Sequence, residues 1–512
     1  MKIPVQMHAA DRDDIQGLLR SGYGHHTEAC FLLLRIKDRE AARAWLLAAP
    51  VTSAAAFERP SGTAASAVAK SLPQTVLQVA LSSEGLRALG VGDDIVEGFA
   101  AEFVSGMGGD ANQARRLGDI GASAPECWRW GTGPRVPHVL VLLYALPGHL
   151  GAWRQVIEDQ CMAGFDTLAC LETANSIDFE PFGFRDGISQ PELDWDRRRP
   201  ARDEVQLAYA NLSCLGEFVL GYPNEYGGYT DRPLLDAAGD AQAALPQAED
   251  APGKADLGRN GSYLVLRQLQ QHVQEFWKFL DSAAAGDPDR RERLGAAMVG
   301  RSLQGVPLAG AANEGDTRDA ATSRPDLNAF DYHSDPQGLR CPLGAHIRRA
   351  NPRNADLPAG TRGIVSRLIR TLGFDAEALQ QDLVASTRFH RLLRRGRKYG
   401  ASSLADSLTS PPGAEAGIHF ISLGANLARQ FEFVQNAWMT GTKFDGLTAE
   451  SDPLLGPRLP APDGTRTDGY SIPQPGGPDR CVAGLPQFVT VVGGAYFFLP
   501  GIRALRYLAT AR

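Results

Sequence analysis

The sequence lacks the patterns that mark membrane proteins, zinc proteases, phosphate-binding loops and zinc clusters. Its longest apolar run, residues 139–146, is far too short to span a bilayer. The motifs HExxH, GxxxxGKS/T and CxxC are absent, so none of the sites built on them is expected. The seven cysteines are scattered, which predicts free thiols in a reducing compartment and not a disulfide framework.

An excess of positive charge is also lacking. The 512 residues include 52 lysines and arginines against 59 aspartates and glutamates, a formal net charge of −7, which argues against nucleic acid or an anionic membrane as the main partner. Residues 1–14 contain no apolar leader, so we expect a cytoplasmic protein. No cargo-type tag is expected after the last strand and helix. The sequence leaves the oligomeric state open between a monomer and a homodimer.

What the chain does contain is a repeated alternation of strands and helices. A helix expected to begin with Ser83 as its cap follows the second strand, and a short helical pattern covers 364–372. The proline-rich run 451–484 predicts an irregular surface excursion. The pattern as a whole predicts an α+β fold in two similar halves, with helices packed on one face of a sheet. The expected strands are 29–36, 75–81, 138–145, 168–173, 262–269, 417–423 and 488–499, and the main helices are 39–47, 84–89, 153–160, 273–280 and 426–438.

The stretch 341–353, CPLGAHIRRANPR, contains one histidine, His346, followed directly by a cluster of arginines. A neutral imidazole can bind iron, and guanidinium groups can bind carboxylates such as haem propionates. The stretch therefore indicates a ligand that is both metal-centred and anionic. A lone histidine is more often an ordinary polar residue, so this stretch by itself leaves both interpretations open.

Two further stretches carry residues suited to chemistry. In FGFRDGISQP, residues 182–191, glycines stand on both sides of Asp186, and such a loop can bring a carboxylate close to a ligand. A pattern as short as GxxDG arises by chance, and for these five residues alone a turn capped by an aspartate is the favoured explanation. In FHRLLRRGRKYG, residues 389–400, Arg394 precedes a second arginine and a glycine, although basic runs usually form solvated faces.

Set side by side in chain order, FGFRDGISQP, CPLGAHIRRANPR, HRLLRRGRKYG and NLARQFEFVQNAW closely resemble the dye-decolourising peroxidases, a family of haem peroxidases. The resemblance continues through GEFVLGYPNEYG and NGSYLVLRQLQQHVQEFWKFLD and is nearest to the longer members. It implies an α+β fold of two ferredoxin-like halves. We expect these halves at 1–225, which carries the GxxDG loop, and at 226–512, which binds haem b.

The resemblance also implies a role for individual residues. His346 matches the histidine that binds the iron, and Asp186 and Arg394 match the aspartate and arginine on the opposite side of the haem. Glu432 is a candidate for the carboxylate that accepts a hydrogen bond from the His346 imidazole. The candidate partners of the haem propionates are Arg349 and Arg353.

The activity implied by the resemblance is that of a peroxidase. Hydrogen peroxide would oxidise phenolic or dye-like one-electron donors through a ferryl haem and radical, formed with Asp186 and Arg394. An aspartate that acts as acid and base predicts an acidic pH optimum. Tyr399 is a candidate electron relay, although a ring that only packs explains it equally well. Two alternatives stay open: a haem carrier or haem-deferrating protein of the same fold, and a haem-free α+β binding module.

Overall fold

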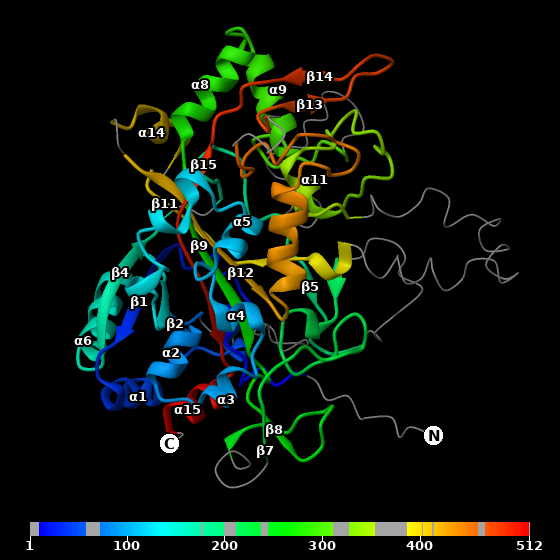
Figure 1. Ribbon diagram of the computed structural model, residues 1–512. Coiled ribbons are helices and arrows are strands. Elements are labelled where there is room, and N and C mark those ends of the chain that lie inside the picture. Colours follow the sequence, from blue (N-terminus) through cyan, green and yellow to red (C-terminus); the bar gives the residue numbers. More distant parts are fainter. Residues whose placement is uncertain are drawn as a thin grey trace, which may run out of the picture.

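A single antiparallel sheet of nine strands forms the centre of the computed structural model (Figure 1). The structure describes residues 10–57, 72–175, 178–198, 211–236, 244–310, 327–353, 387–401, 403–411, 414–458 and 466–510. The helical pattern at 364–372 lies outside these residues. The strands of the sheet are β1 (Glu28–Ile36), β2 (Thr75–Leu81), β3 (Val139–Ala145), β4 (Phe165–Glu172), β9 (Ser262–Gln271), β10 (Leu393–Arg394), β11 (Arg397–Tyr399), β12 (Ala416–Gly424) and β15 (Val489–Leu499).

Two similar halves make up this sheet, whose strand order is β10-β12-β9-β15-β2-β3-β1-β4, with β11 paired to β12. Within each half the strands lie in the order fourth, first, third, second, which is the order of a ferredoxin-like unit. The halves meet where Phe498 of β15 pairs with Leu81 of β2. The predicted α+β fold with two ferredoxin-like halves is confirmed. The boundary at 225/226 falls between β4 and β9 and stays a prediction, because the sheet continues through both halves.

Helices connect and cover the strands. Within the first half, α1 and α6 follow β1 and β3, and α15 packs beside α1 although it comes from the end of the chain (Figure 1). No helix in the described part of the chain has the length and apolar character needed to cross a membrane. The helices are α1 (Arg39–Ala48), α2 (Ser83–Ala88), α3 (Asp93–Val96), α4 (Ala101–Ser105), α5 (Ala111–Leu117), α6 (Leu150–Cys161), α8 (Val273–Ala283), α9 (Pro288–Val299), α11 (His346–Ala350), α14 (Leu404–Thr409) and α15 (Ile502–Thr510).

The apolar runs of β1 and β3 are continuous because both faces of the sheet are covered. Leu32 and Leu34 of β1 belong to the same core cluster as residues of α1 and α6. Phe31 and Leu33 point to the other face, where they share a cluster with Leu18 and other residues of irregular segments. Successive side chains of a strand point to opposite faces, so a strand buried on both sides needs apolar residues at every position.

Two local expectations need correction. The cap of α2 is Ser82 and not Ser83, since the Ser82 hydroxyl accepts a hydrogen bond from the Gly85 amide at 3.0 Å. The proline-rich run is not simply a surface excursion. It includes the short strands β13 (Tyr470–Ile472) and β14 (Arg480–Val482), and its Asp452 is completely buried. The Arg458 guanidinium donates to the carbonyls of Asp452 and Pro453 and so replaces the backbone pairing that prolines prevent.

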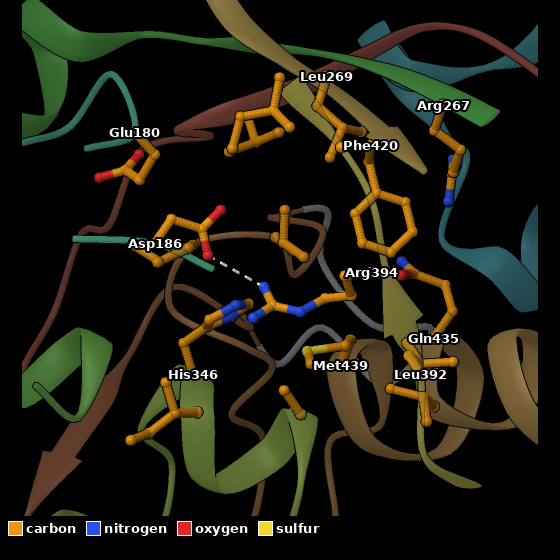
Figure 2. A pocket seen from close by; sticks show the side chains of 18 of the residues that line it. Glu180, Asp186, Arg267, Leu269, His346, Leu392, Arg394, Phe420, Gln435 and Met439 are labelled. Atoms are coloured by element: carbon orange, nitrogen blue, oxygen red, sulfur yellow. Dashed lines mark hydrogen bonds and ion pairs between the residues drawn. The ribbon is translucent and has the colours of Figure 1, made fainter. Parts of the chain in front are cut away.

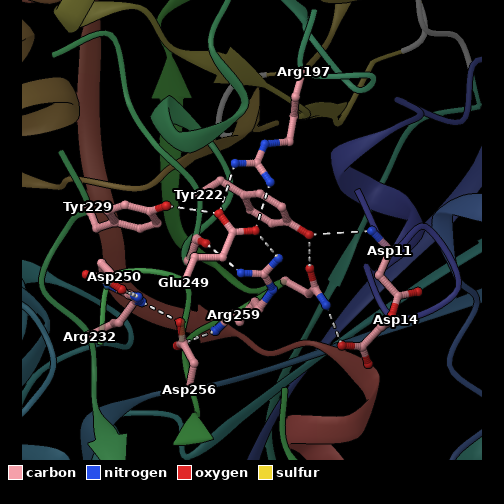
Figure 3. Close-up of polar contacts among 12 residues, drawn as sticks. Asp11, Asp14, Arg197, Tyr222, Tyr229, Arg232, Glu249, Asp250, Asp256 and Arg259 are labelled. Atoms are coloured by element: carbon pink, nitrogen blue, oxygen red, sulfur yellow. Dashed lines mark hydrogen bonds and ion pairs between the residues drawn. The ribbon is translucent and has the colours of Figure 1, made fainter. Parts of the chain in front are cut away.

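A buried ion-pair network fastens the segments that follow β4 (Figure 3). The Glu249 carboxylate lies between the guanidinium groups of Arg197, at 2.8 Å, and Arg259, at 2.7 Å. The Tyr229 hydroxyl donates to the same carboxylate. Burial opposes the charge on Glu249, but the two arginines outweigh it and lower its pKa to about 2. The network therefore stays charged at neutral pH. The short strands of this region are β5 (Glu192–Leu193), β6 (Leu212–Ser213), β7 (Leu234–Asp236) and β8 (Lys254–Asp256).

The helix expected at 426–438 is wound as two π-helical segments, η9 (Ala428–Glu432) and η10 (Val434–Thr440). Such wide turns are rare and lie frequently at functional sites. Phe431, Val434 and Met439 of these segments face a cavity that is also lined by β9 and β12. The second half of the chain thus provides three walls of the cavity.

Candidate active site

The cavity has a volume of about 470 Å³, which is within the usual range for sites that bind small molecules and cofactors. It is enclosed by β9, β12, the π-helical segments, the GxxDG loop and α11. Figure 2 shows His346, Asp186 and Arg394 converging on it. Most of its surface is apolar, with contributions from Leu269, Phe420, Phe431, Val434, Met439 and Val491.

His346 is the first residue of α11 and lines the cavity. Its Nδ1 lies 3.0 Å from Oδ2 of Asp452, whose other oxygen accepts hydrogen bonds from the amides of Leu454 and Leu455. Burial disfavours charge on both partners of the pair. Their mutual attraction outweighs it, so the pKa of His346 is raised and the pKa of Asp452 is lowered. Because the carboxylate holds Nδ1, the Nε2 edge of the ring is the one available to a ligand in the cavity.

The expectation that Glu432 supports the imidazole is wrong. Its Oε1 accepts hydrogen bonds from the Gln113 side chain at 2.7 Å and from the Tyr496 hydroxyl at 2.8 Å. Glu432 therefore faces α5 and β15, and Asp452 makes the contact with His346. A motif match within a helix does not fix which face a residue occupies, and here the helix has π-helical turns. Asp452 was missed because it begins a proline-rich run with no periodic pattern.

Asp186 and Arg394 form an ion pair on the cavity wall. Arg394 Nη1 donates to Oδ1 of Asp186 at 3.2 Å, and the Gly187 amide donates to the same oxygen at 2.6 Å. The Asp186 side chain is 41% exposed, to the cavity. Burial acts to raise its pKa, but Arg394 and the Gly187 amide outweigh it, so the pKa of Asp186 is lowered. Asp186 is therefore a carboxylate at neutral pH.

The loop that carries Asp186 is organised by Glu180. Its carboxylate accepts hydrogen bonds from the amides of Phe182 and Phe184, at 3.0 and 2.9 Å, and from the Gln271 side chain at 2.7 Å. Burial raises the pKa of Glu180 to about 7. Gly183 has φ 96°, and a Cβ there would lie 2.7 Å from the Leu404 side chain, so this turn requires glycine. Glu180 was missed, although it stands directly before the PFGFRDG string.

The two arginines expected to bind propionates differ in position. Arg349 is completely buried outside the cavity lining, and its guanidinium donates to the carbonyls of Trp438, Gly441 and Glu450. The expectation for Arg349 is wrong, because its side chain points to the C-terminal end of η10 and the residues after it, and not into the cavity. Arg353 does line the cavity and stacks over the Phe330 ring at 3.8 Å.

Three guanidinium groups meet around Ser189. Arg301 and Arg353 donate to its hydroxyl at 2.9 and 3.4 Å, and Arg394 donates to its carbonyl at 3.3 Å. Burial, followed by repulsion from Arg353, lowers the pKa of Arg301 to about 10. This positively charged side of the cavity suits carboxylates of a ligand.

The composition of the cavity fits a haem. One imidazole edge is directed into it, apolar side chains form most of its walls, and guanidinium groups stand where propionates could be held. Among the described residues, no group of three or more histidine, cysteine, aspartate or glutamate side chains could hold a bare metal ion. The sequence-based candidate Tyr399 is outside the cavity lining. Its ring stacks on His419 with centroids 4.5 Å apart, and its role as a relay stays a prediction.

The fold and the site together describe an α+β protein whose cavity is centred on a histidine and fits a cofactor. Comparison with proteins of known sequence and structure identifies this class more closely. The chain matches no protein-family model. It is 28% identical over 466 residues to the multifunctional dye peroxidase DyP2 of Amycolatopsis sp., covering 86% of this chain and 83% of that protein. It is 27% identical over 514 residues to the dye-decolorizing peroxidase AauDyP1 of Auricularia auricula-judae, covering 96% and 86%.

Solved structures agree with these relatives. The crystal structure of the fungal DyP-type peroxidase of Auricularia auricula-judae matches with a TM-score of 0.70 at 26% identity, over 98% of this chain and all of that one. An ancestral D-type dye-decolorizing peroxidase shares the fold, with a TM-score of 0.72 at 24% identity over 98% of this chain. The resemblance indicated by the sequence motifs is confirmed: the relatives and solved structures that this chain matches are dye-decolourising peroxidases.

Proposed function

We propose that the protein binds haem b in this cavity and uses hydrogen peroxide to oxidise phenolic or dye-like donors. The observation that carries the proposal is the convergence of His346, Asp186 and Arg394 on one cavity. His346 would bind the iron, and Arg353 would hold a propionate. The bound haem would supply the site of peroxide reduction and of one-electron oxidation of the donor.

Asp452 prepares His346 for this role. A carboxylate that accepts the Nδ1 proton fixes the imidazole in the tautomer with a free Nε2 lone pair. It also increases the electron density on the ring, which strengthens binding to an oxidised metal. Because Asp452 is completely buried and held by two backbone amides, it keeps the ring in a constant orientation.

Asp186 and Arg394 would carry out the proton transfers. As a carboxylate, Asp186 can accept a proton from hydrogen peroxide and return it to the oxygen that leaves as water. The Arg394 guanidinium supplies a positive charge for the oxygen that becomes anionic during bond cleavage. Their ion pair at 3.2 Å holds both groups on the same side of the cavity.

A haem carrier or haem-deferrating protein is the alternative, and the Asp186–Arg394 pair disfavours it because simple binding needs no acid–base couple. The test compares wild type with Asp186→Asn and Arg394→Leu, each loaded with haem. We expect all three to show a Soret band, and both variants to lose about 10²–10⁴-fold in kcat/KM for peroxide. Full turnover in both variants would exclude the proposed roles, and a wild type that binds haem without turnover would favour the carrier.

A further inference from the structure

The cavity contains one side chain that peroxide chemistry oxidises readily. Met439, the second-last residue of η10, is 4% exposed, and its thioether points into the cavity (Figure 2). No cysteine, tyrosine or tryptophan is among the described residues that line this cavity, and Met439 is the only methionine among them. A thioether is soft and polarisable, and oxidants convert it to a sulfoxide. Met439 is therefore the most easily oxidised side chain that faces an oxidant in the cavity.

The other methionines in the described part of the chain have different surroundings. Met107 is buried in one hydrophobic cluster and Met298 of α9 in another, and neither lines the cavity. Met162, which follows α6, is 66% exposed. An oxidant in bulk solution should therefore act first on Met162, whereas an oxidant that reacts inside the cavity should act on Met439. The chain thus contains an internal reference for each case.

The backbone of Met439 is joined to the residue that supports His346. The Met439 carbonyl accepts a hydrogen bond from the Asp452 amide at 2.8 Å, and Oδ2 of Asp452 lies 3.0 Å from Nδ1 of His346. Oxidation turns the flexible apolar side chain of methionine into a polar one. Because most of the cavity wall is apolar, the new oxygen lacks hydrogen-bond partners unless the chain around it moves. Such a movement would act on the segment that positions Asp452.

We propose that Met439 is the residue at which hydrogen peroxide oxidises, and thereby inactivates, the protein when no reducing donor is present. The inference rests on the proposed peroxidase function, which brings peroxide into the cavity. The O–O bond of peroxide breaks, one oxygen forms a bond to the Met439 sulfur through a sulfur lone pair, and the other oxygen leaves as water. The sulfur gives up two electrons and peroxide takes them. One thioether and one peroxide thus give one sulfoxide and one water.

The ion pair on the cavity wall should make this oxygen transfer faster than it is in solution. One proton must move from the transferred oxygen to the departing one, and Asp186 is a carboxylate that can carry it. Arg394, 3.2 Å from Asp186, offers positive charge to the departing oxygen. A phenolic donor competes with the sulfur for the same oxidising equivalents. Oxidation of Met439 should therefore be fast only when haem is bound and the donor is exhausted.

The test treats the full-length protein, with and without bound haem, with a graded excess of hydrogen peroxide and no donor. Catalase stops the reaction, and peptide mass mapping measures the gain of about 16 Da at each methionine. In the haem-loaded protein we expect Met439 to be oxidised about 100-fold faster than Met107 and Met298, and ahead of Met162. In the haem-free protein Met162 should be oxidised first. A phenolic donor in excess should protect Met439 in the loaded protein.

Variants connect the sulfoxide to the loss of activity. Met439→Leu keeps an apolar side chain of similar size without the sulfur, so it should retain a larger fraction of its own starting turnover after the same exposure to peroxide. The matched control Met162→Leu should lose turnover as wild type does. In haem-loaded Asp186→Asn, the oxidation of Met439 should be slower than in wild type.

The outcomes separate this inference from the proposed function. If the loaded protein turns over peroxide but oxidises Met439 no faster than Met107 and Met298, the inference is wrong and the proposed function stands. The inference is also overturned if Met439→Leu loses turnover as quickly as wild type. A loaded protein without any turnover would overturn both. Mass mapping of wild type decides the inference even where Met439→Leu fails to fold.

Discussion

Nδ1 of His346 and Oδ2 of Asp452 lie 3.0 Å apart, and the Asp452 carboxylate is completely buried. These residues are more than a hundred positions apart in the chain, and they bring a short helix and a proline-rich segment together at one wall of the cavity. The pair sets which nitrogen of the ring faces a ligand. It is the contact on which the proposed haem ligation depends most directly.

Replacing Asp452 by Asn should weaken haem binding or activity by about 10–100-fold, because the imidazole loses its anionic partner. The measurement is haem titration followed by the Soret band, together with the reduction potential of the bound iron, which should rise. Glu432→Gln is the matched control, since Glu432 contacts Gln113 and Tyr496. If the control alters the potential and Asp452→Asn does not, the assignment of the supporting carboxylate is wrong.

The pH dependence of peroxide turnover should report Asp186. Its folded pKa lies below the ordinary aspartate value of about 3.9, so the carboxylate persists into acidic solution and is lost only as the pH falls through the lowered pKa. We expect wild-type kcat/KM for peroxide to stay high at mildly acidic pH. In Arg394→Gln the acid limb should move to higher pH, because Arg394 lowers the pKa of Asp186. An acid limb that stays in place would show that another group titrates.

Glu180 should make the protein less stable as the pH rises. Its folded pKa of about 7 exceeds the unfolded value of about 4.3, so the folded chain holds the proton more tightly between these values. The free energy of unfolding should fall across this window, by up to about 4 kcal/mol from this group. Urea unfolding at pH values near both ends of this window measures the fall. In Glu180→Gln the free energy of unfolding should change less between these two pH values than in wild type. An unchanged slope would mean that its three hydrogen bonds keep the carboxylate ionised.

Arg349→Met should destabilise the fold without altering the side chains that line the cavity. Three buried carbonyls, those of Trp438, Gly441 and Glu450, would lose their donors, at a cost of about 2–4 kcal/mol. Thermal unfolding measures this loss. Haem affinity per folded molecule should match wild type, whereas Arg353→Met should reduce it. Equal loss of haem affinity in both variants would restore Arg349 as a propionate partner.

Local patterns predicted the strands well because burial on both faces makes a strand such as β1 continuously apolar. The four motifs similarly led to His346, Asp186 and Arg394, which the fold brings to one cavity. Asp452 could not be found in this way, since its burial depends on packing between distant segments. The contacts of Arg349 could not be predicted for a related reason. Helical spacing places this residue on α11, but only the segments packed around the helix determine what its side chain contacts.

The place of β15 in the sheet constrains how this protein can be made. Among the described residues it is the last strand in chain order, yet it lies between β9 and β2, and α15 behind it packs on α1. During translation the ribosome therefore releases β2 and β9 long before the strand that joins them. Until then both nascent halves present unpaired edges, so we expect this interval to be when the chain is most prone to aggregate.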